Sequence, residues 1–143
     1  MPSANTAYST YKNIDLRANT SEKSPSELIV MLYDSLCANL RGALLILDNH
    51  ELEHSNWEKR LGATERFYNS TAKAIELITA LQQMLDFERG EPLASQLNNT
   101  YLLIRKGVWN ASQEKNQTDM TKMLTACSEL RAAWKLVAEA KSN

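Results

Sequence analysis

Apolar side chains recur every three or four residues along most of the chain, a spacing that is typical of amphipathic helices rather than strands. The clearest stripe comprises Leu28, Leu32, Leu36, Leu40, Ala43 and Leu47. It follows Ser24, a suitable N-cap, and Pro25, which suits the first helical position, and Glu27 completes a capping box. A stripe of this length runs for about 30 Å and must be covered by other helices.

Three further amphipathic segments follow, and each has a recognisable start or stop. Ser55 is expected to cap the second helix, with Glu58 completing another capping box. Gly90, which takes positive φ freely, is expected to end that helix, and Pro92 to open the third. Thr118 is expected to cap the fourth helix. The four predicted helices span about 24–48, 55–88, 92–114 and 118–139.

The sequence therefore predicts an all-α fold, an antiparallel up-down four-helix bundle over residues 24–140. Gly107 lies within the third stripe, where glycine weakens a helix by roughly 1 kcal/mol relative to alanine. A glycine there permits close approach of a neighbouring backbone or of a client side chain.

Residues 1–23 are expected to form an N-terminal arm, of which the first seven residues are disordered. Tyr8, Tyr11 and Ile14 form a short amphipathic stripe on this arm. Two turns of helix are too short to be stable alone in water. The arm is therefore expected to dock on the bundle, dock on a partner, or stay loose.

Composition and charge exclude several classes of function. With 16 basic and 17 acidic residues the net charge is −1, and no basic face suits a nucleic acid backbone. No uncharged apolar run is long enough to predict membrane insertion, and residues 1–10 lack a signal-peptide pattern. Cys37 and Cys127 fall on apolar helical faces, which indicates buried thiols and a reducing cytoplasm.

The string His50-Glu51-Leu52-Glu53-His54 matches the zinc-protease pattern H-E-x-x-H. That chemistry requires both histidines on one face of a continuous helix, whereas this string lies between the end of one predicted helix and the Ser55 cap of the next. A third ligand would have to come from a carboxylate such as Glu65 or Glu76. A charged interhelical loop is the favoured interpretation, and we predict no metal site, no cofactor and no catalytic residue.

Residues 24–34 resemble the S-P-x-x-L-[IV]-x-M-L-[FY]-D opening of the flagellin-specific export chaperones, the FliS family. Further similar segments, within a resemblance that covers about residues 8–138, are Tyr11 and Ile14 on the arm, Lys73-Ala74-Ile75, Leu85 to Gly90, Leu93-Ala94, Leu97 to Tyr101 and Ala133-Trp134. The chain departs from the family pattern at Ser35, Glu91-Pro92 and Gly107, and residues 48–69 form a longer region than usual.

The resemblance implies a helical bundle that binds the C-terminal segment of newly made flagellin in the cytoplasm. Such a chaperone prevents premature polymerisation and docks on a protein of the flagellar type III export gate. It is not an enzyme, and we expect a monomer or weak homodimer. The candidate client-binding residues are Tyr8, Tyr11, Ile14, Leu32, Tyr33, Leu85, Phe87, Leu97, Tyr101 and Ile104. The family further implicates the arm tyrosine, here Tyr11, in docking to the export gate.

Our hypothesis is that the arm covers part of an apolar groove when the client is absent. Two alternatives remain at this point. One is a structural bundle that oligomerises through the same grooves, and the other is a zinc-dependent hydrolase that uses His50, Glu51 and His54.

Overall fold

The computed structural model describes residues 24–142 of the chain. Within this range the chain forms four α-helices, a single 3-10 turn and no strand: α2 (Pro25–Asp48), η1 (Glu51–Glu53), α3 (Trp57–Gln83), α4 (Leu93–Glu114) and α5 (Gln117–Ser142). The predicted arm over residues 1–23, with Tyr8, Tyr11 and Ile14, lies outside the described residues. The all-α fold class is confirmed.

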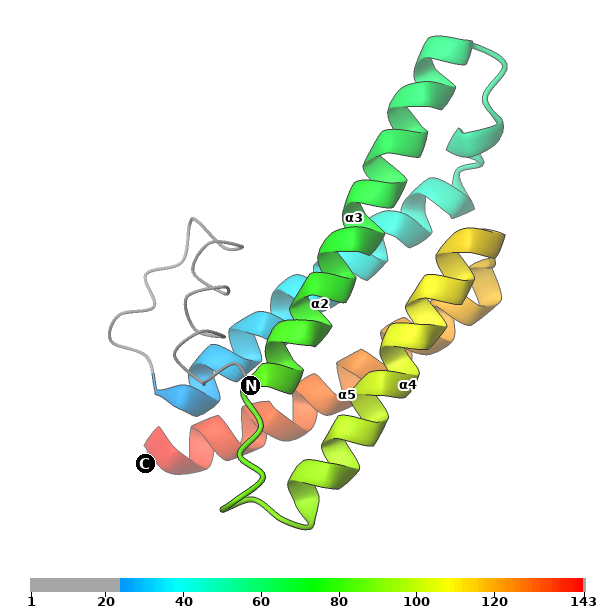
Figure 1. Ribbon diagram of the computed structural model, residues 1–143. Helices are drawn as coiled ribbons and strands as arrows, with labels where there is room; N and C mark the ends of the chain where they lie inside the picture. Colours follow the sequence, from blue (N-terminus) through cyan, green and yellow to red (C-terminus); the bar gives the residue numbers. More distant parts are fainter. Residues whose placement is uncertain (1–23, 143) are drawn as a thin grey trace.

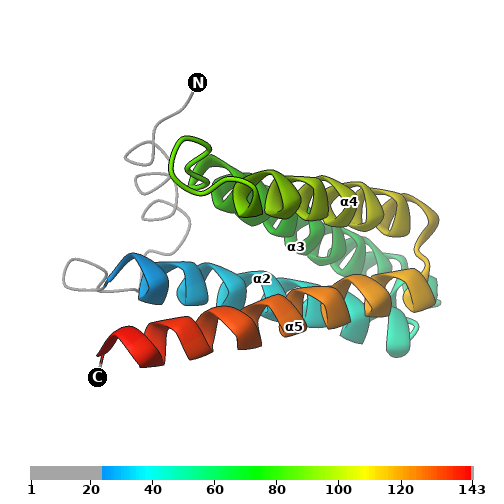
Figure 2. The ribbon, with the colours of Figure 1, turned by 90° about the horizontal axis from the view of Figure 1, so that it is seen from below.

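Each helix packs against two neighbours, so that the four helices close into a bundle. Figure 2 shows two layers, with α2 beside α5 in one and α3 beside α4 in the other. The chain reverses direction at each connection, and α2 begins at the same end of the bundle as the connection between α3 and α4 (Figure 1). We call the opposite end, which carries η1, the tip. The predicted antiparallel four-helix bundle is therefore the observed arrangement.

The helices begin where a side chain satisfies the first free backbone N–H groups. Ser24 caps α2, because its Oγ accepts a hydrogen bond from the N–H of Glu27 at 3.2 Å. The cap of α3 is Asn56 and not the expected Ser55, because the Asn56 amide oxygen accepts from the N–H groups of both Glu58 and Lys59. α3 therefore starts at Trp57, two residues later than the sequence pattern predicts.

α3 also ends earlier than residue 88, because Asp86 organises a turn beyond Gln83. The Asp86 carboxylate accepts hydrogen bonds from the N–H groups of Glu88 and Arg89, both at 3.0 Å, and so competes with helical bonding. Gly90 does not act as a left-handed cap, since no described glycine has positive φ. Glycine is needed there for space, because an added Cβ would lie 2.7 Å from the Asp86 carbonyl oxygen.

The turn between α4 and α5 depends on Lys115 and Asn116. Lys115 adopts the left-handed conformation with φ 52°, and the N–H of Asn116 donates to the Ala111 carbonyl at 2.9 Å, which closes α4. The Asn116 side chain then accepts from the N–H of Asp119 at 3.0 Å. Asn116, rather than the expected Thr118, therefore caps α5, which begins at Gln117.

Gly107 of α4 lies directly against the Met123 side chain of α5. A Cβ added at Gly107 would overlap the Sδ atom of Met123 on α5. The space that glycine leaves is thus filled by a side chain of this chain, and not by a neighbouring backbone or a client side chain.

The core lies along the bundle axis, with contributions from all four helices. Its largest fully buried side chains are Tyr33, Phe67, Leu32, Leu36, Leu40, Leu77, Ile78, Leu81, Met120, Val108 and Cys37. Cys37 and Cys127 are both free and buried, as their places on apolar stripes indicate. Burial raises the pKa of both thiols, that of Cys127 to about 12, so each remains a neutral, weakly reactive group.

By length and composition alone, α2 is apolar enough to cross a membrane. The central helix of a folded bundle passes the same test, and α2 packs on both α3 and α5. It also carries Asp34, which forms an ion pair with Arg131 of α5. We therefore interpret the hydrophobicity of α2 as that of a core helix.

Candidate functional site: an apolar groove at the end of the bundle

An apolar groove opens at the end of the bundle opposite the tip, and we call it the end groove. Its volume is about 150 Å³. The end groove is lined by Ile29, Leu81, Met84, Leu85, Asp86, Gly90, Leu93, Ala94, Leu97, Tyr101 and Trp134. All four helices and the α3–α4 connection therefore contribute to it, and its walls are largely aliphatic or aromatic. Figure 1 shows this end of the bundle, where α2 begins and the connection between α3 and α4 turns.

The connection between α3 and α4 contributes to the end groove through Asp86 and Gly90. Asp86 holds the first part of this connection through its two backbone hydrogen bonds. Gly90 then lets the backbone lie close to the Asp86 carbonyl, with the N–H of Gly90 donating to that oxygen at 2.8 Å. Both residues of the turn line the groove, so the connection fixes its outer wall.

Tyr33 and Tyr101 form a polar contact beneath the groove. Their hydroxyl oxygens lie 2.6 Å apart, although Tyr33 is fully buried and Tyr101 nearly so. Burial raises the pKa of both phenols above the ordinary value of 10.0, and the Trp134 side chain offsets part of this rise for both. The contact between the hydroxyls joins α2 and α4 under the aromatic wall formed by Tyr101 and Trp134.

The structure divides the candidate client-binding residues among the groove, its surroundings and the core. Leu85, Leu97 and Tyr101 line the end groove. Phe87 lies half-buried in the α3–α4 connection, but not on the groove wall. Leu32, Tyr33 and Ile104 are core side chains, with 4% exposure or less, and present almost no surface to a partner. The candidates Tyr8, Tyr11 and Ile14 lie outside the described residues.

Sequence reasoning missed six apolar residues of the end groove: Ile29, Leu81, Met84, Leu93, Ala94 and Trp134. Leu93 is the most informative, because it is 58% exposed at the first position of α4. An apolar residue directly after Pro92, at a helix start where polar side chains are usual, is the signal that would have pointed to it.

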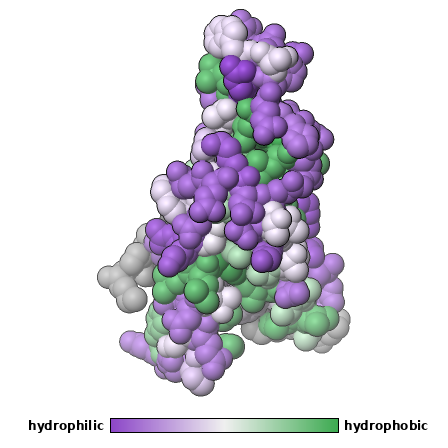
Figure 3. Space-filling model, turned by 90° about the vertical axis from the view of Figure 1, so that its right-hand side faces the viewer, coloured by the Kyte–Doolittle hydropathy of each residue, from purple (hydrophilic) through white to green (hydrophobic). Residues whose placement is uncertain are grey.

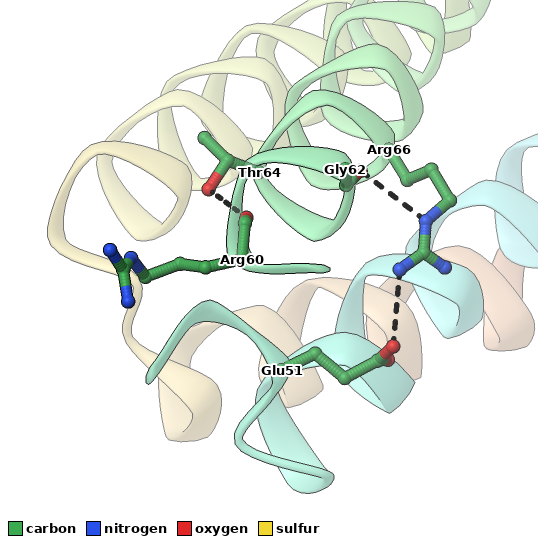
Figure 4. Close-up of polar contacts among 5 residues, drawn as sticks. All are labelled: Glu51, Arg60, Gly62, Thr64 and Arg66. Carbon is green, nitrogen blue, oxygen red and sulfur yellow. Dashed lines mark hydrogen bonds and ion pairs between the residues drawn. The ribbon is translucent and has the colours of Figure 1, made fainter. Parts of the chain in front are cut away.

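The tip shows why the H-E-x-x-H string does not form a metal site. α2 ends at Asp48, His50 takes the left-handed conformation with φ 53°, and residues 51–53 form a 3-10 turn, so the string is not on a continuous helix. Figure 4 shows the Glu51 carboxylate turned toward Arg66 of α3, with Arg66 Nη2 3.1 Å from Glu51 Oε1. Among the described residues no group of three His, Cys, Asp or Glu side chains is placed to hold a metal ion.

With an apolar groove between its helices, this bundle has the kind of site that can receive a peptide or helix of a partner. Comparison with known families agrees with that class. The model of the flagellar protein FliS family matches residues 5–141, nearly the whole chain, and the protein therefore belongs to that family. The resemblance noted from the sequence motifs is confirmed. No individual curated protein matches the chain.

Family membership implies a flagellar export chaperone whose partners are proteins such as flagellin. This is a chaperone family that is not known for enzymatic activity. The end groove, with no catalytic pattern on its walls, offers apolar surface, which is what a chaperone needs to cover an aggregation-prone segment.

Proposed function

We propose that this protein is a cytoplasmic export chaperone that binds the C-terminal segment of flagellin. It prevents that segment from polymerising prematurely and delivers it to the flagellar type III export apparatus. The observation that carries the proposal is the family match over residues 5–141 in a bundle whose end groove includes Leu85, Leu97 and Tyr101.

The chemistry of the end groove supports an amphipathic helical client. Leu93 and Leu97 lie one helical turn apart on α4, and Leu81 of α3 and Leu85 of the following connection also line the groove. An apolar stripe on a client helix can pack against these side chains. Ordering a client that is disordered when free offsets part of the contact energy, so the complex is expected to be reversible enough for release at the export gate.

The arm is proposed to compete with the client for the end groove. The described chain starts at Ser24, and Ile29, only five residues further on, already lines the groove. Tyr8, Tyr11 and Ile14 carry an apolar stripe that suits the same walls. Deleting residues 1–17 should therefore raise both client affinity and binding of a hydrophobic dye, and unchanged values for both would refute the role of the arm as a lid.

Tyr11 is proposed to dock the loaded chaperone on the export gate. Replacing Tyr11 with alanine should then leave flagellin binding intact while weakening capture of the complex by the purified gate protein. Equal capture of the wild-type and Tyr11→Ala complexes would refute this assignment.

The proposed function is tested by mixing the protein with a synthetic peptide of the flagellin C-terminal segment. Circular dichroism should show more helix in the mixture than in the sum of the components, and calorimetry should give one peptide per chaperone. No gain of helix and no heat of binding would refute the proposal. Sedimentation of the free protein, expected to show a monomer or weak homodimer, separates this function from that of an oligomerising structural bundle.

A further inference from the structure

A second and larger groove, distinct from the end groove, runs along the side of the bundle between α3 and α4, and we call it the side groove. Its volume is about 750 Å³. The side groove is lined by Tyr68, Thr71, Ala72, Ile75, Glu76, Leu102, Arg105, Lys106, Trp109, Ser112 and Gln113. It shares no residue with the end groove. Figure 3 shows, on a face that includes α4, hydrophobic side chains in patches bordered by hydrophilic ones.

The walls of the side groove have the spacing that a helix requires of its receptor. On α3 the apolar lining residues Tyr68, Ala72 and Ile75 recur at helical spacing, and on α4 Leu102 and Trp109 stand seven residues apart. Leu102 is 47% exposed and Trp109 is 56% exposed, so two large apolar side chains two turns apart on one helix face are open to a partner. The lined part of α4, from residue 102 to 113, is about 17 Å long and matches roughly three turns of a guest helix.

The charges of the side groove select the kind of helix that fits. Arg105 and Lys106 lie on the α4 wall, and neither has a carboxylate within ion-pair distance among residues 24–142. Lys115 adds a third cation at the end near the tip, with its Nζ 5.8 Å from the centre of the Tyr68 ring. Glu76 on the α3 wall is the one carboxylate that lines the groove. The cationic excess favours a guest whose apolar stripe is flanked by acidic side chains.

Charge also argues against two surfaces of this chain as occupants of the side groove. The arm stripe is interspersed with Lys12, Asp15 and Arg17, so it brings no acidic excess. A second copy would offer the exposed Trp57 and Leu61 of α3, which are flanked by Lys59 and Arg60 as well as by Glu58. Neither surface complements Arg105 and Lys106.

We propose that the side groove is a docking site for an acidic amphipathic helix of another protein. Trp109 and Leu102 are the apolar anchors of the site, Tyr68 and Ile75 form its opposite wall, and Arg105 and Lys106 pair with the acidic flank of the guest. This site shares no lining residue with the end groove, so a failure of the proposal for one groove leaves the proposal for the other intact.

The test uses two synthetic helical peptides of about 15 residues that share one leucine stripe, long enough to cover the groove. One peptide carries glutamate on both flanks and the other carries lysine. Fluorescence anisotropy with the full-length protein should show at least tenfold tighter binding of the glutamate peptide at about 0.05 M salt. The difference should shrink at about 0.5 M salt, because added ions screen the exposed charges.

Two variants of the side groove and two control variants locate the binding. The double variant Arg105→Glu and Lys106→Glu should bind the glutamate peptide at least tenfold more weakly than the wild type does. Trp109→Ala should lower the affinity for both peptides. The matched control pair Lys122→Glu and Lys135→Glu, exposed cations on α5, should leave affinity within twofold. Leu93→Asp in the end groove should also leave it unchanged. Circular dichroism verifies that each variant retains the helical fold.

Several results would overturn the proposal. Equal affinity for the two peptides would show that the groove does not select an acidic helix. An equal loss of affinity in the groove variants and in the control variants would show the same. A wild-type dimer in sedimentation that Arg105→Glu and Lys106→Glu dissociate would assign the groove to a second copy. Peptide binding that appears only after deletion of residues 1–17 would assign it to the arm.

Discussion

The hydrogen bond between Tyr33 and Tyr101 gives the sharpest prediction about what holds the end groove in shape. The two hydroxyl oxygens lie 2.6 Å apart in an environment where both side chains are 2% exposed or less. Replacing either tyrosine with phenylalanine keeps the ring but leaves the other hydroxyl without its closest partner. An unsatisfied buried polar group costs about 1–3 kcal/mol.

One hydroxyl donates this hydrogen bond and the other accepts it, so the two single substitutions remove different halves of the same bond. We expect each of Tyr33→Phe and Tyr101→Phe to lower the free energy of unfolding by about 1–3 kcal/mol.

The double variant distinguishes this bond from simple loss of two polar groups. Once both hydroxyls are gone, neither is left unsatisfied, so the double variant should lose less than the sum of the single losses, by about 1 kcal/mol. Urea unfolding followed by circular dichroism gives all four free energies. Tyr68→Phe is the control, because the Tyr68 hydroxyl has no hydrogen-bond partner within residues 24–142, and it should change stability by less than about 0.5 kcal/mol. Losses that add to within about 0.3–0.5 kcal/mol would refute the coupling.

Three further predictions follow from burial, capping and titration. Phe67→Ala removes a fully buried ring and should cost about 3–5 kcal/mol in urea unfolding, and a loss below about 1 kcal/mol would contradict its place in the core. Ser24→Ala should cost about 1 kcal/mol whereas Ser24→Asp should retain the cap, and equal stability of the two variants would contradict the bond to Glu27. Burial raises the pKa of Cys127 from 9.0 to about 12, so the thiol ionises at a lower pH in the unfolded protein than in the folded one. The free energy of unfolding should therefore keep the contribution of the neutral thiol below pH 9 and lose it as the pH rises toward 12. Urea unfolding across that pH range should show a smaller decline in the free energy of unfolding for Cys127→Ala than for the wild type. An identical decline in the two proteins would contradict the raised pKa of Cys127.

The helices were predictable because each carries an apolar stripe at helical spacing, and no competing strand pattern exists. Exact starts were harder, since Ser55 and Asn56 are both good caps and only the backbone geometry decides between them. The same holds for Asn116 and Thr118 at the start of α5. In each case the amide oxygen of asparagine, rather than the neighbouring hydroxyl, accepts the free N–H groups of the first turn.

The groove residues were less predictable, because a stripe does not reveal which of its members face another helix. Leu32 and Leu97 belong to similar stripes, yet Leu32 is fully buried whereas Leu97 lines the end groove. The difference arises where α3 stops at Gln83 and leaves the start of α4 uncovered. Gly107 shows the same limit, since only the packing of Met123 identifies what fills the space beside it.

The central claim is that the end groove receives the flagellin segment, and two matched leucine variants test it most directly. Leu93 lines the groove at 58% exposure, and Leu45 of α2 lies outside it at 59% exposure. An aspartate at either position should therefore change the stability of the fold to a similar extent. Calorimetry with the flagellin C-terminal peptide should show at least a tenfold loss of affinity for Leu93→Asp, about 1.4 kcal/mol, because the new carboxylate would be desolvated by the client. Leu45→Asp should bind as the wild type does. Wild-type affinity in Leu93→Asp, or an equal loss in both variants, would contradict the claim.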